Sequence, residues 1–153
     1  MRSLNLAEKA YIAGIIDGEG TITLSKKHKN ETPSPRVTIS NCNLDVLKWI
    51  KKKAGYGNIQ RKKRVREHHS IPFELRILSD RAIHFLNEIK DYLRIKKPHA
   101  ILITEKYKSV TLRNGRYSKD LLEKKMKLVN DIKKLNQRPH YASYNTPGST
   151  KKG

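Results

Sequence analysis

Two acidic residues, and the small residues that precede them, form the part of the sequence best suited to chemistry. The segment Tyr11–Gly20 reads YIAGIIDGEG, and small residues recur at Ala10, Gly14 and Gly18. A helix with this four-residue spacing has a flat face that the backbone of a second helix can approach closely. Two such helices side by side would bring two Glu19 carboxylates together at one end. These carboxylates suit a hard divalent cation such as Mg²⁺, which binds few protein ligands and keeps several waters.

The elements around this segment alternate between helical and extended patterns. A helix is expected from Leu6 to about Gly18, with Asn5 as its cap, and an alternating strand follows over residues 19–27. Further elements follow in chain order: a strand at 36–40, a helix at 43–54, strands at 58–66 and 71–78, a helix at 79–92 capped by Ser79-Asp80, a helix to about Tyr107 with Pro98 in its first turn, and a helix at 118–135 with Leu121, Leu122, Met126, Val129 and Ile132 inward. Pro72 indicates an edge strand or the start of pairing.

This order predicts an α+β fold with an αββαββα core and two additional C-terminal helices. One four-stranded antiparallel sheet would carry helices on one face and leave the other in water. The 153 residues suit one domain, which we expect over residues 1–136. Residues 137–153 contain two prolines and a Lys-Lys pair and are expected to form a flexible basic tail.

Residues 12–20, IAGIIDGEG, resemble the LAGLIDADG motif of homing endonucleases: seven of the nine positions are identical or exchange one aliphatic residue for another. Glu19 stands where the family usually has Asp. The resemblance covers roughly residues 6–135, including the helix that ends in Gly55-Tyr56-Gly57. It implies the single-motif, homodimeric type, whose sheet forms a DNA-binding saddle. The alternative interpretation of the motif is an ordinary amphipathic helix with a glycine cap.

The resemblance also implies the roles of individual residues. Glu19 would be the essential metal ligand, joined by the backbone carbonyl of Gly18, with Mg²⁺ as the cofactor and Mn²⁺ or Ca²⁺ able to occupy the same site. Lys96 would stabilise developing charge, and Asn41 would order water at the site. Asp17 is expected to cap the helix end or to order the turn rather than to act in catalysis. The helix pairing would run through five residues: Ala10, Ala13, Gly14, Asp17 and Gly18.

The exposed sheet face is predicted to read DNA, because a two-stranded ribbon fits the major groove. Alternation places hydrogen-bonding and basic side chains there, and flanking cations would contact phosphates. The predicted DNA-binding residues are Thr21, Thr23, Ser25, Lys27, Lys29, Arg36, Thr38, Ser40, Gln60, Lys62, Arg64, Arg66, Glu74 and Arg76. The alternative is a merely solvated face, but the uncompensated cations of Arg61-Lys62-Lys63-Arg64 favour a polyanion.

The overall composition supports the same partner. Lys and Arg total 34 against 14 Asp and Glu, which gives a net charge of +20 and a pI near 10.2. Such an excess indicates nucleic acid first and an anionic membrane second. No stretch approaches the ~20 apolar residues of a membrane span, and no targeting segment is seen, so an intracellular location with its DNA is expected. The single cysteine, Cys42, excludes an internal disulfide.

The predicted function is therefore a site-specific homing endonuclease that makes a metal-dependent double-strand break in a long, near-palindromic DNA target as a homodimer. Beyond DNA and a second copy, no membrane or other protein partner is implied. One alternative is a protein of the same fold that binds nucleic acid without cutting it, either an RNA-splicing maturase or a transcription regulator. Another is a basic RNA-associated protein, such as a ribosomal component, which would be a monomer.

Overall fold

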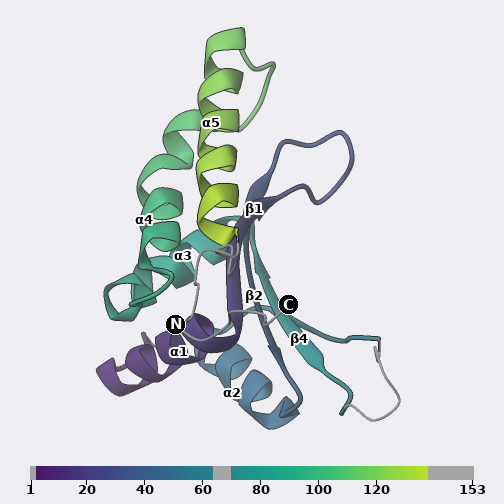
Figure 1. Cartoon of the computed structure of the whole chain (residues 1–153), viewed down its shortest axis with the longest axis vertical. Coiled ribbons are helices and arrows are strands. Elements are labelled where there is room, and N and C mark those ends of the chain that lie inside the picture. Colours follow the sequence, from purple (N-terminus) through teal and green to yellow (C-terminus); the bar gives the residue numbers. More distant parts are fainter. Residues whose placement is uncertain (1–2, 64–69, 138–153) are drawn as a thin grey trace, which may run out of the picture.

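A four-stranded antiparallel sheet carries the helices of this protein on one face (Figure 1). The computed structural model describes residues 3–63 and 70–137. The elements are α1 (Leu6–Glu19), β1 (Gly20–Ser25), β2 (Ser34–Asn41), α2 (Leu44–Ala54), β3 (Asn58–Arg61), β4 (Phe73–Leu78), α3 (Ser79–Ile89), the 3₁₀ turn η1 (Lys90–Tyr92), α4 (Lys97–Lys106), the 3₁₀ turn η2 (Lys108–Val110) and α5 (Lys119–Asn136). The predicted α+β class and αββαββα core are confirmed.

The strands lie in the order β1-β2-β4-β3, so the two hairpins meet along β2 and β4. In the β2–β4 pair, Thr38 is opposite Arg76 and Ser40 is opposite Glu74. In the β3–β4 pair, Gln60 is opposite Glu74. This register brings side chains from three strands onto one exposed face.

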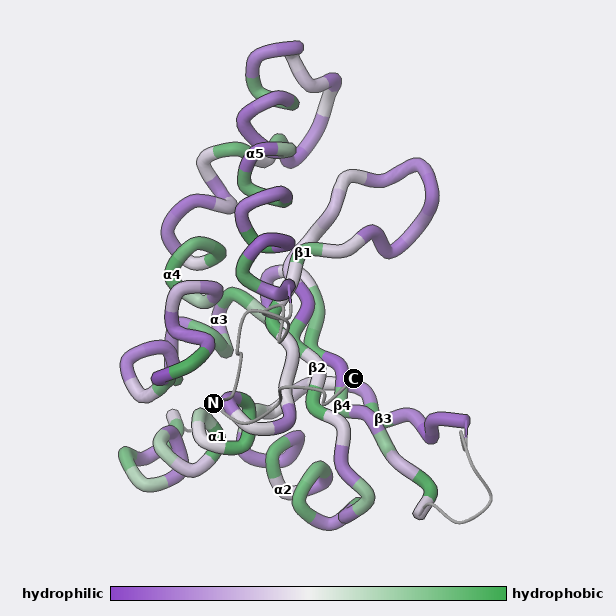
Figure 2. Tube along the Cα trace, in the orientation of Figure 1, coloured by the Kyte–Doolittle hydropathy of each residue, from purple (hydrophilic) through white to green (hydrophobic). Residues whose placement is uncertain are grey.

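Alternation along the strands explains the single buried face of the sheet. Ile22, Val37, Ile39, Leu75 and Ile77 are buried beneath the helices, while most of their neighbours in sequence are partly exposed. The core continues into the helices through a shared apolar cluster: Ile12, Ile16, Leu47, Ile50, Phe85, Leu86, Ile89, Ala100, Ile103, Val129 and Ile132. Figure 2 shows the contrasting hydrophilic residues of the loop after β1 and of the segment after β3.

Local sequence signals account for most of the helix ends. Asn5 and Glu8 form a capping box at the start of α1, as the predicted Asn5 cap requires. Gly55 ends α2 in the left-handed conformation (φ 85°), Ser118 caps α5, and Pro98 lies in the first turn of α4.

Three predictions about these elements were wrong. The N-cap of α3 is Leu78, without a side-chain cap, and neither Ser79 nor Asp80 fills that role; Ser79 has a φ of 55°. Strand β3 ends at Arg61, short of the predicted residue 66, although the Lys62 amide still donates to the Pro72 carbonyl at 2.9 Å. In α5, Val129 and Ile132 are buried as predicted, but Leu122 and Met126 are exposed. Residues 64–66, and all of the predicted tail except Gln137, lie outside the described residues.

Candidate metal site and nucleic-acid interface

Glu19 is the last residue of α1, and its side chain is exposed where the helix meets β1. The chain can turn from helix into strand at this point because the next residue is glycine. A Cβ on Gly20 would lie 2.9 Å from both the Cα and the carbonyl oxygen of Ile16, closer than real Cβ contacts allow. Gly20 therefore sets the position of Glu19 at the start of the sheet.

Asn41, at the end of β2, holds the Glu19 carboxylate in place. Its Nδ2 donates to Glu19 Oε2 at 2.6 Å. Its Oδ1 accepts the backbone N–H of Asn43 at 2.8 Å, and Asn43 in turn caps α2 through the amide of Val46. Because a backbone N–H can only donate, the Asn41 amide must present its nitrogen to Glu19. The start of α2 thus orients the side chain that orients Glu19.

Asp17, two residues before Glu19, is bound to a distant part of its own chain. Its carboxylate accepts the backbone N–H groups of Arg94 (2.8 Å), Ile95 (3.2 Å) and Lys96 (2.9 Å) just before α4. Burial raises the pKa of Asp17, but these three hydrogen bonds and the nearby Lys96 charge outweigh it and hold the pKa below its usual 3.8. Asp17 therefore orders the turn that leads into α4; because the three amides precede Lys97, the first residue of α4, it does not cap that helix.

Lys96 completes this connection between α1 and α4. Its Nζ donates to the carbonyl oxygens of Ile16 (3.0 Å) and Asp17 (2.8 Å), which belong to the last turn of α1. Burial lowers the pKa of Lys96, while the Asp17 charge opposes that shift. The Lys96 ammonium thus lies at the carboxyl end of α1, on the carbonyls of the two residues that precede Gly18.

The donor atoms at this end of α1 are suited to a hard divalent cation. The Glu19 carboxylate and the backbone carbonyl of Gly18 are oxygen ligands of the kind that Mg²⁺ and Ca²⁺ prefer. Within residues 3–63 and 70–137 no group of three or more His, Cys, Asp or Glu side chains could hold a metal. The described part of one protomer thus contributes two oxygen donors here, the Glu19 carboxylate and the Gly18 carbonyl.

An open trough of about 720 Å³ runs along α1 to this carboxylate and is lined in part by Ala10, Gly14, Gly18, Glu19 and Asn41. A Cβ added to Gly14 or to Gly18 would meet no atom of the described residues within 4 Å. Glycine inside a helix costs about 1 kcal/mol relative to alanine, and no packing among residues 3–63 and 70–137 accounts for it at these two positions. A helix surface kept low in this way allows another backbone to approach closely.

Two residues predicted for this face are placed otherwise. Ala13 is fully buried in the core of its own chain, because it belongs to the buried side of α1 with Ile12 and Ile16. The Asp17 carboxylate is used by the segment before α4. The exposed stripe therefore consists of Ala10, Gly14 and Gly18.

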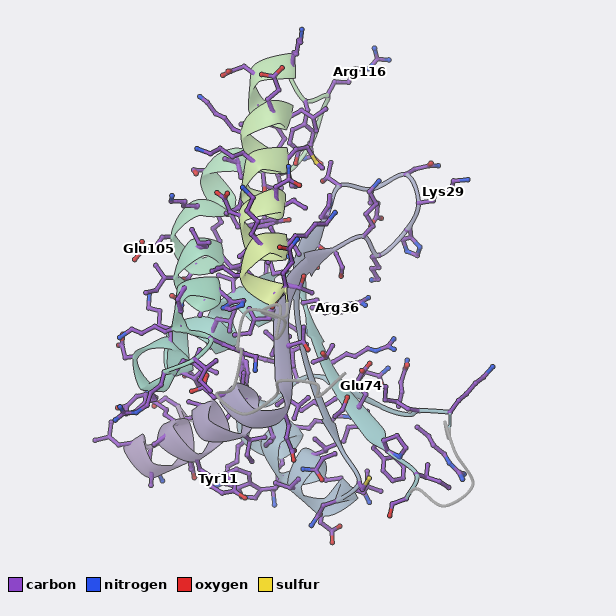
Figure 3. All side chains as sticks on the ribbon, in the orientation of Figure 1. Tyr11, Lys29, Arg36, Glu74, Glu105 and Arg116 are labelled. Carbon is purple, nitrogen blue, oxygen red and sulfur yellow. The ribbon has the colours of Figure 1, made fainter. Side chains whose placement is uncertain are left out.

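The exposed face of the sheet carries most of the predicted DNA-binding residues together. Those within strands on this face are Thr21, Thr23, Ser25, Arg36, Thr38, Ser40, Gln60 and Arg76. Lys27 and Lys29 lie in the exposed loop after β1, and Lys62 follows β3 directly. Figure 3 shows Arg36 and Glu74 on the sheet and Lys29 on the loop. Arg64 and Arg66 lie outside the described residues.

Glu74 differs from the other residues of this face because its carboxylate is already occupied. The side chain is buried and contacts Arg76 Nε through Oε1, and Lys62 Nζ through Oε2 at 3.3 Å. Ser40 Oγ lies 3.5 Å from Oε2 and 3.2 Å from Lys62 Nζ. Burial raises the pKa of Glu74, but the Arg76 and Lys62 partners hold it below 4.5. Glu74 therefore holds two cations on this face through its carboxylate, and its own contact with DNA stays a prediction.

Asn58 is a face residue that the predicted set of DNA contacts omitted. It pairs with Arg76 in the register of β3 and β4 and is exposed two residues before Gln60. The alternation that selected Gln60 also selects Asn58.

In the described parts of the chain, no helix has the length and apolar character of a membrane span.

Comparisons with known proteins reveal the fold but no close relative. No protein-family model and no curated protein sequence matches the chain. Among solved structures, the homing endonuclease I-CvuI in complex with its target, with Ca present, matches at a TM-score of 0.65 and 17% identity over 88% of this chain and 85% of that one. An archaeal intron-encoded homing endonuclease, I-Vdi141I, complexed with DNA, matches at 0.69 and 22% over 88% and 87%.

A larger protein gives the same result. The LAGLIDADG homing endonuclease I-GzeII in complex with its DNA target matches at a TM-score of 0.57 and 18% identity, over 85% of this chain but only 44% of that one. In all three comparisons the similarity extends over most of this chain. This chain therefore has the fold of the LAGLIDADG homing endonucleases.

Proposed function

We propose that this protein is a site-specific homing endonuclease that acts as a homodimer and makes a double-strand break in a long, near-palindromic DNA target with Mg²⁺ as cofactor. One observation carries the proposal: the exposed Glu19 carboxylate lies at the end of a helix face on which Gly14 and Gly18 have open space among the described residues. A face of this kind needs a partner, and a second copy brings a second Glu19 to the same place.

The charge and the sheet of the protomer also agree with a homodimer on DNA. A symmetric pair would place two exposed sheet faces along one duplex, and a two-fold dimer reads half-sites related by the same symmetry. The net charge of +20 supports a duplex partner because phosphate contacts dominate affinity for DNA.

The residues of the site have separable tasks in the proposed reaction. Glu19 and the Gly18 carbonyl of each protomer would hold the divalent ion, which supplies an activated water and neutralises charge on the phosphate. Asn41 keeps the Glu19 carboxylate in one orientation, because its amide is itself fixed by Asn43. Asp17 and Lys96 hold the last turn of α1 against α4, so the position of Glu19 does not depend on α1 alone. We keep Lys96 as the candidate that stabilises charge at the scissile phosphate.

The test starts with a cleavage-site selection from a randomised duplex library with Mg²⁺, followed by binding and cutting assays on the selected target. Glu19→Gln should retain DNA binding and lose cleavage, because the amide is a poor ligand for a hard cation. Glu105→Gln is the matched control, since Glu105 is exposed on α4 and points away from the sheet (Figure 3). Undiminished cutting by Glu19→Gln would remove Glu19 from the mechanism.

The same experiment separates the alternatives. A wild-type protein that binds duplex DNA but never cuts it would instead be a transcription regulator of this fold. A protein that prefers folded intron RNA would be a splicing maturase. We also propose that this protein is encoded within an intron, because I-Vdi141I, which has a similar fold, is an intron-encoded homing endonuclease.

A further inference from the structure

A fully buried lysine joins three segments of the chain on the first half of α5. Lys125 is 0% exposed, and its Nζ donates to Thr32 Oγ1 at 2.8 Å and to the Tyr117 hydroxyl at 2.9 Å. The ammonium also lies 5.0 Å from the ring centroid of Tyr107 and 5.1 Å from that of Tyr117. Within residues 3–63 and 70–137, Lys125 forms no ion pair with a carboxylate.

An ammonium group buried among neutral groups is costly unless its hydrogens are used. Here two hydroxyl oxygens and two aromatic faces compensate the burial. A leucine or methionine would fill the same space without that cost. The hydrogen bonds of Lys125 are therefore important because of the chain segments that they join.

They connect two loops to one helix. Thr32 lies in the loop between β1 and β2, residues 26–33, and Tyr117 lies in the loop between η2 and α5, residues 111–118. The Tyr117 hydroxyl also accepts the backbone N–H of Leu112 at 3.1 Å. Lys125 thus holds the second loop near both of its ends, and the first loop near its return to β2.

Both loops are basic and exposed. Lys26, Lys27 and Lys29 lie in the first, with Glu31 as its one acid, and Arg113 and Arg116 lie in the second. Figure 3 shows Lys29 and Arg116 extending toward the same side of the molecule from these neighbouring loops. The first loop is also the continuation of β1 and β2, whose exposed face carries Thr21, Thr23 and Thr38.

We propose that the two loops form one basic edge, defined by Lys26, Lys27, Lys29, Arg113 and Arg116, which Lys125 holds together and which binds the phosphate backbone of DNA beyond the part read by the sheet. This inference rests on the proposed function; Lys27 and Lys29 already belong to the predicted DNA contacts, and the new part is the second loop, with Arg113 and Arg116, and its connection to the first through Lys125. The chemistry favours phosphates over bases, because long exposed cations at a loop edge neutralise backbone charge without reading sequence.

The first test measures salt dependence on two forms of the selected target. The short duplex ends at the outermost base pair that shows a preference, and the long duplex adds about one helical turn, ~10 bp, at each end. For the full-length double variant Arg113→Gln/Arg116→Gln, the slope of log K against log salt should be shallower by about 0.9 for each phosphate that the variant no longer neutralises. The change should appear on the long duplex and be absent on the short one.

The matched control is Lys90→Gln/Lys106→Gln, which removes the same charge from the helices behind the sheet. Equal slopes for the two double variants on the long duplex, with normal wild-type binding, would overturn the edge and leave the proposed function standing. A wild-type protein that binds neither duplex would overturn both.

A second test examines the clamp without DNA. Lys125→Met removes the ammonium, and Thr32→Val removes only the acceptor on the first loop, so it serves if the core substitution prevents folding. Both variants should raise amide hydrogen exchange in residues 26–33, and Lys125→Met should also raise it in residues 111–118. Unchanged exchange in folded variants would show that Lys125 does not hold the loops.

Discussion

Gly14→Ala should change stability and assembly in opposite directions. A methyl group at this position meets no atom within 4 Å in the part of the protomer that the structure describes, so it adds no clash there and removes the conformational freedom of glycine in the unfolded chain. Alanine is favoured over glycine inside a helix by about 0.8–1.0 kcal/mol. The isolated protomer should therefore become more stable by roughly that amount.

In the proposed dimer the same methyl group would be harmful. A two-fold contact through α1 places two added methyl groups, one from each copy, between backbones that approach closely. Overpacking of a tight contact typically costs about 1–3 kcal/mol, which corresponds to a dimer dissociation constant roughly 5- to 150-fold weaker. DNA cleavage should fall at protein concentrations near that constant and recover at higher ones.

Two measurements on the same samples test this prediction. Sedimentation velocity over a concentration series gives the dissociation constant, and urea unfolding at concentrations where the protomers are separate gives the stability. Asn130→Ala is the control for helix propensity alone, because Asn130 is exposed within α5. It should stabilise the protomer without affecting assembly. If Gly14→Ala forms dimers and cuts DNA as the wild type does, the glycine stripe is not a contact surface between copies.

Three further predictions address other parts of the structure. Burial lowers the pKa of His99 below its ordinary 6.5, so the unfolded chain binds a proton more readily than the folded chain does. The free energy of unfolding should therefore fall as the pH drops below about 6.5. In urea titrations at a series of pH values, His99→Gln should flatten this dependence. Asn41→Ala frees the Glu19 carboxylate. Single-turnover cleavage should then slow by roughly 10- to 100-fold, as is typical when the side chain that orients a metal ligand is lost, while the Kd for the target stays within about twofold. Equal changes in the cleavage rate and in the Kd would contradict a positioning role. Glu74→Gln releases two cations from their partner, so the affinity for random duplex should rise and the ratio of specific to non-specific binding should fall in competition assays.

The order of elements and the exposed sheet face were predictable because each depends on residues close together in sequence. The acid-Gly-acid-Gly end of α1, the period of two in the strands and the Asn5 and Pro98 signals are all local. The prediction of which side of a helix is buried was less accurate. For α1, the spacing of Ala10, Gly14 and Gly18 identified the exposed stripe, but Ala13 belongs with the core residues Ile12 and Ile16.

Helix α5 shows the same difficulty more clearly. The prediction turned Leu122 and Met126 inward, yet both are more than a third exposed, and the buried side carries Lys125, Leu128, Val129 and Ile132. A lysine in the run Lys124-Lys125-Met126-Lys127 gives no sequence signal of burial. Its partners Thr32 and Tyr117 become visible only when three segments are brought together.

Contacts between distant residues account for the other differences. Glu74 reads as one polar position among several, because the sequence does not show that β2 and β4 pair, or that Arg76 and Lys62 reach its carboxylate. The hydrogen bonds of Asp17 and Lys96 join residues 77 to 80 positions apart. The resemblance to a motif marked the residues, but their partners follow from tertiary structure.

The Asp17 contact has a practical consequence for dividing the chain. A fragment that ends before Arg94 leaves the Asp17 carboxylate without its three donors and the last carbonyls of α1 without the Lys96 ammonium. The hydrogen bonds at the acid-bearing end of α1 therefore form only with residues that lie 77 to 80 positions later in the chain. A two-piece version of the protein, expressed as complementary halves, should have its break after Lys96 so that the amino-terminal half retains these contacts.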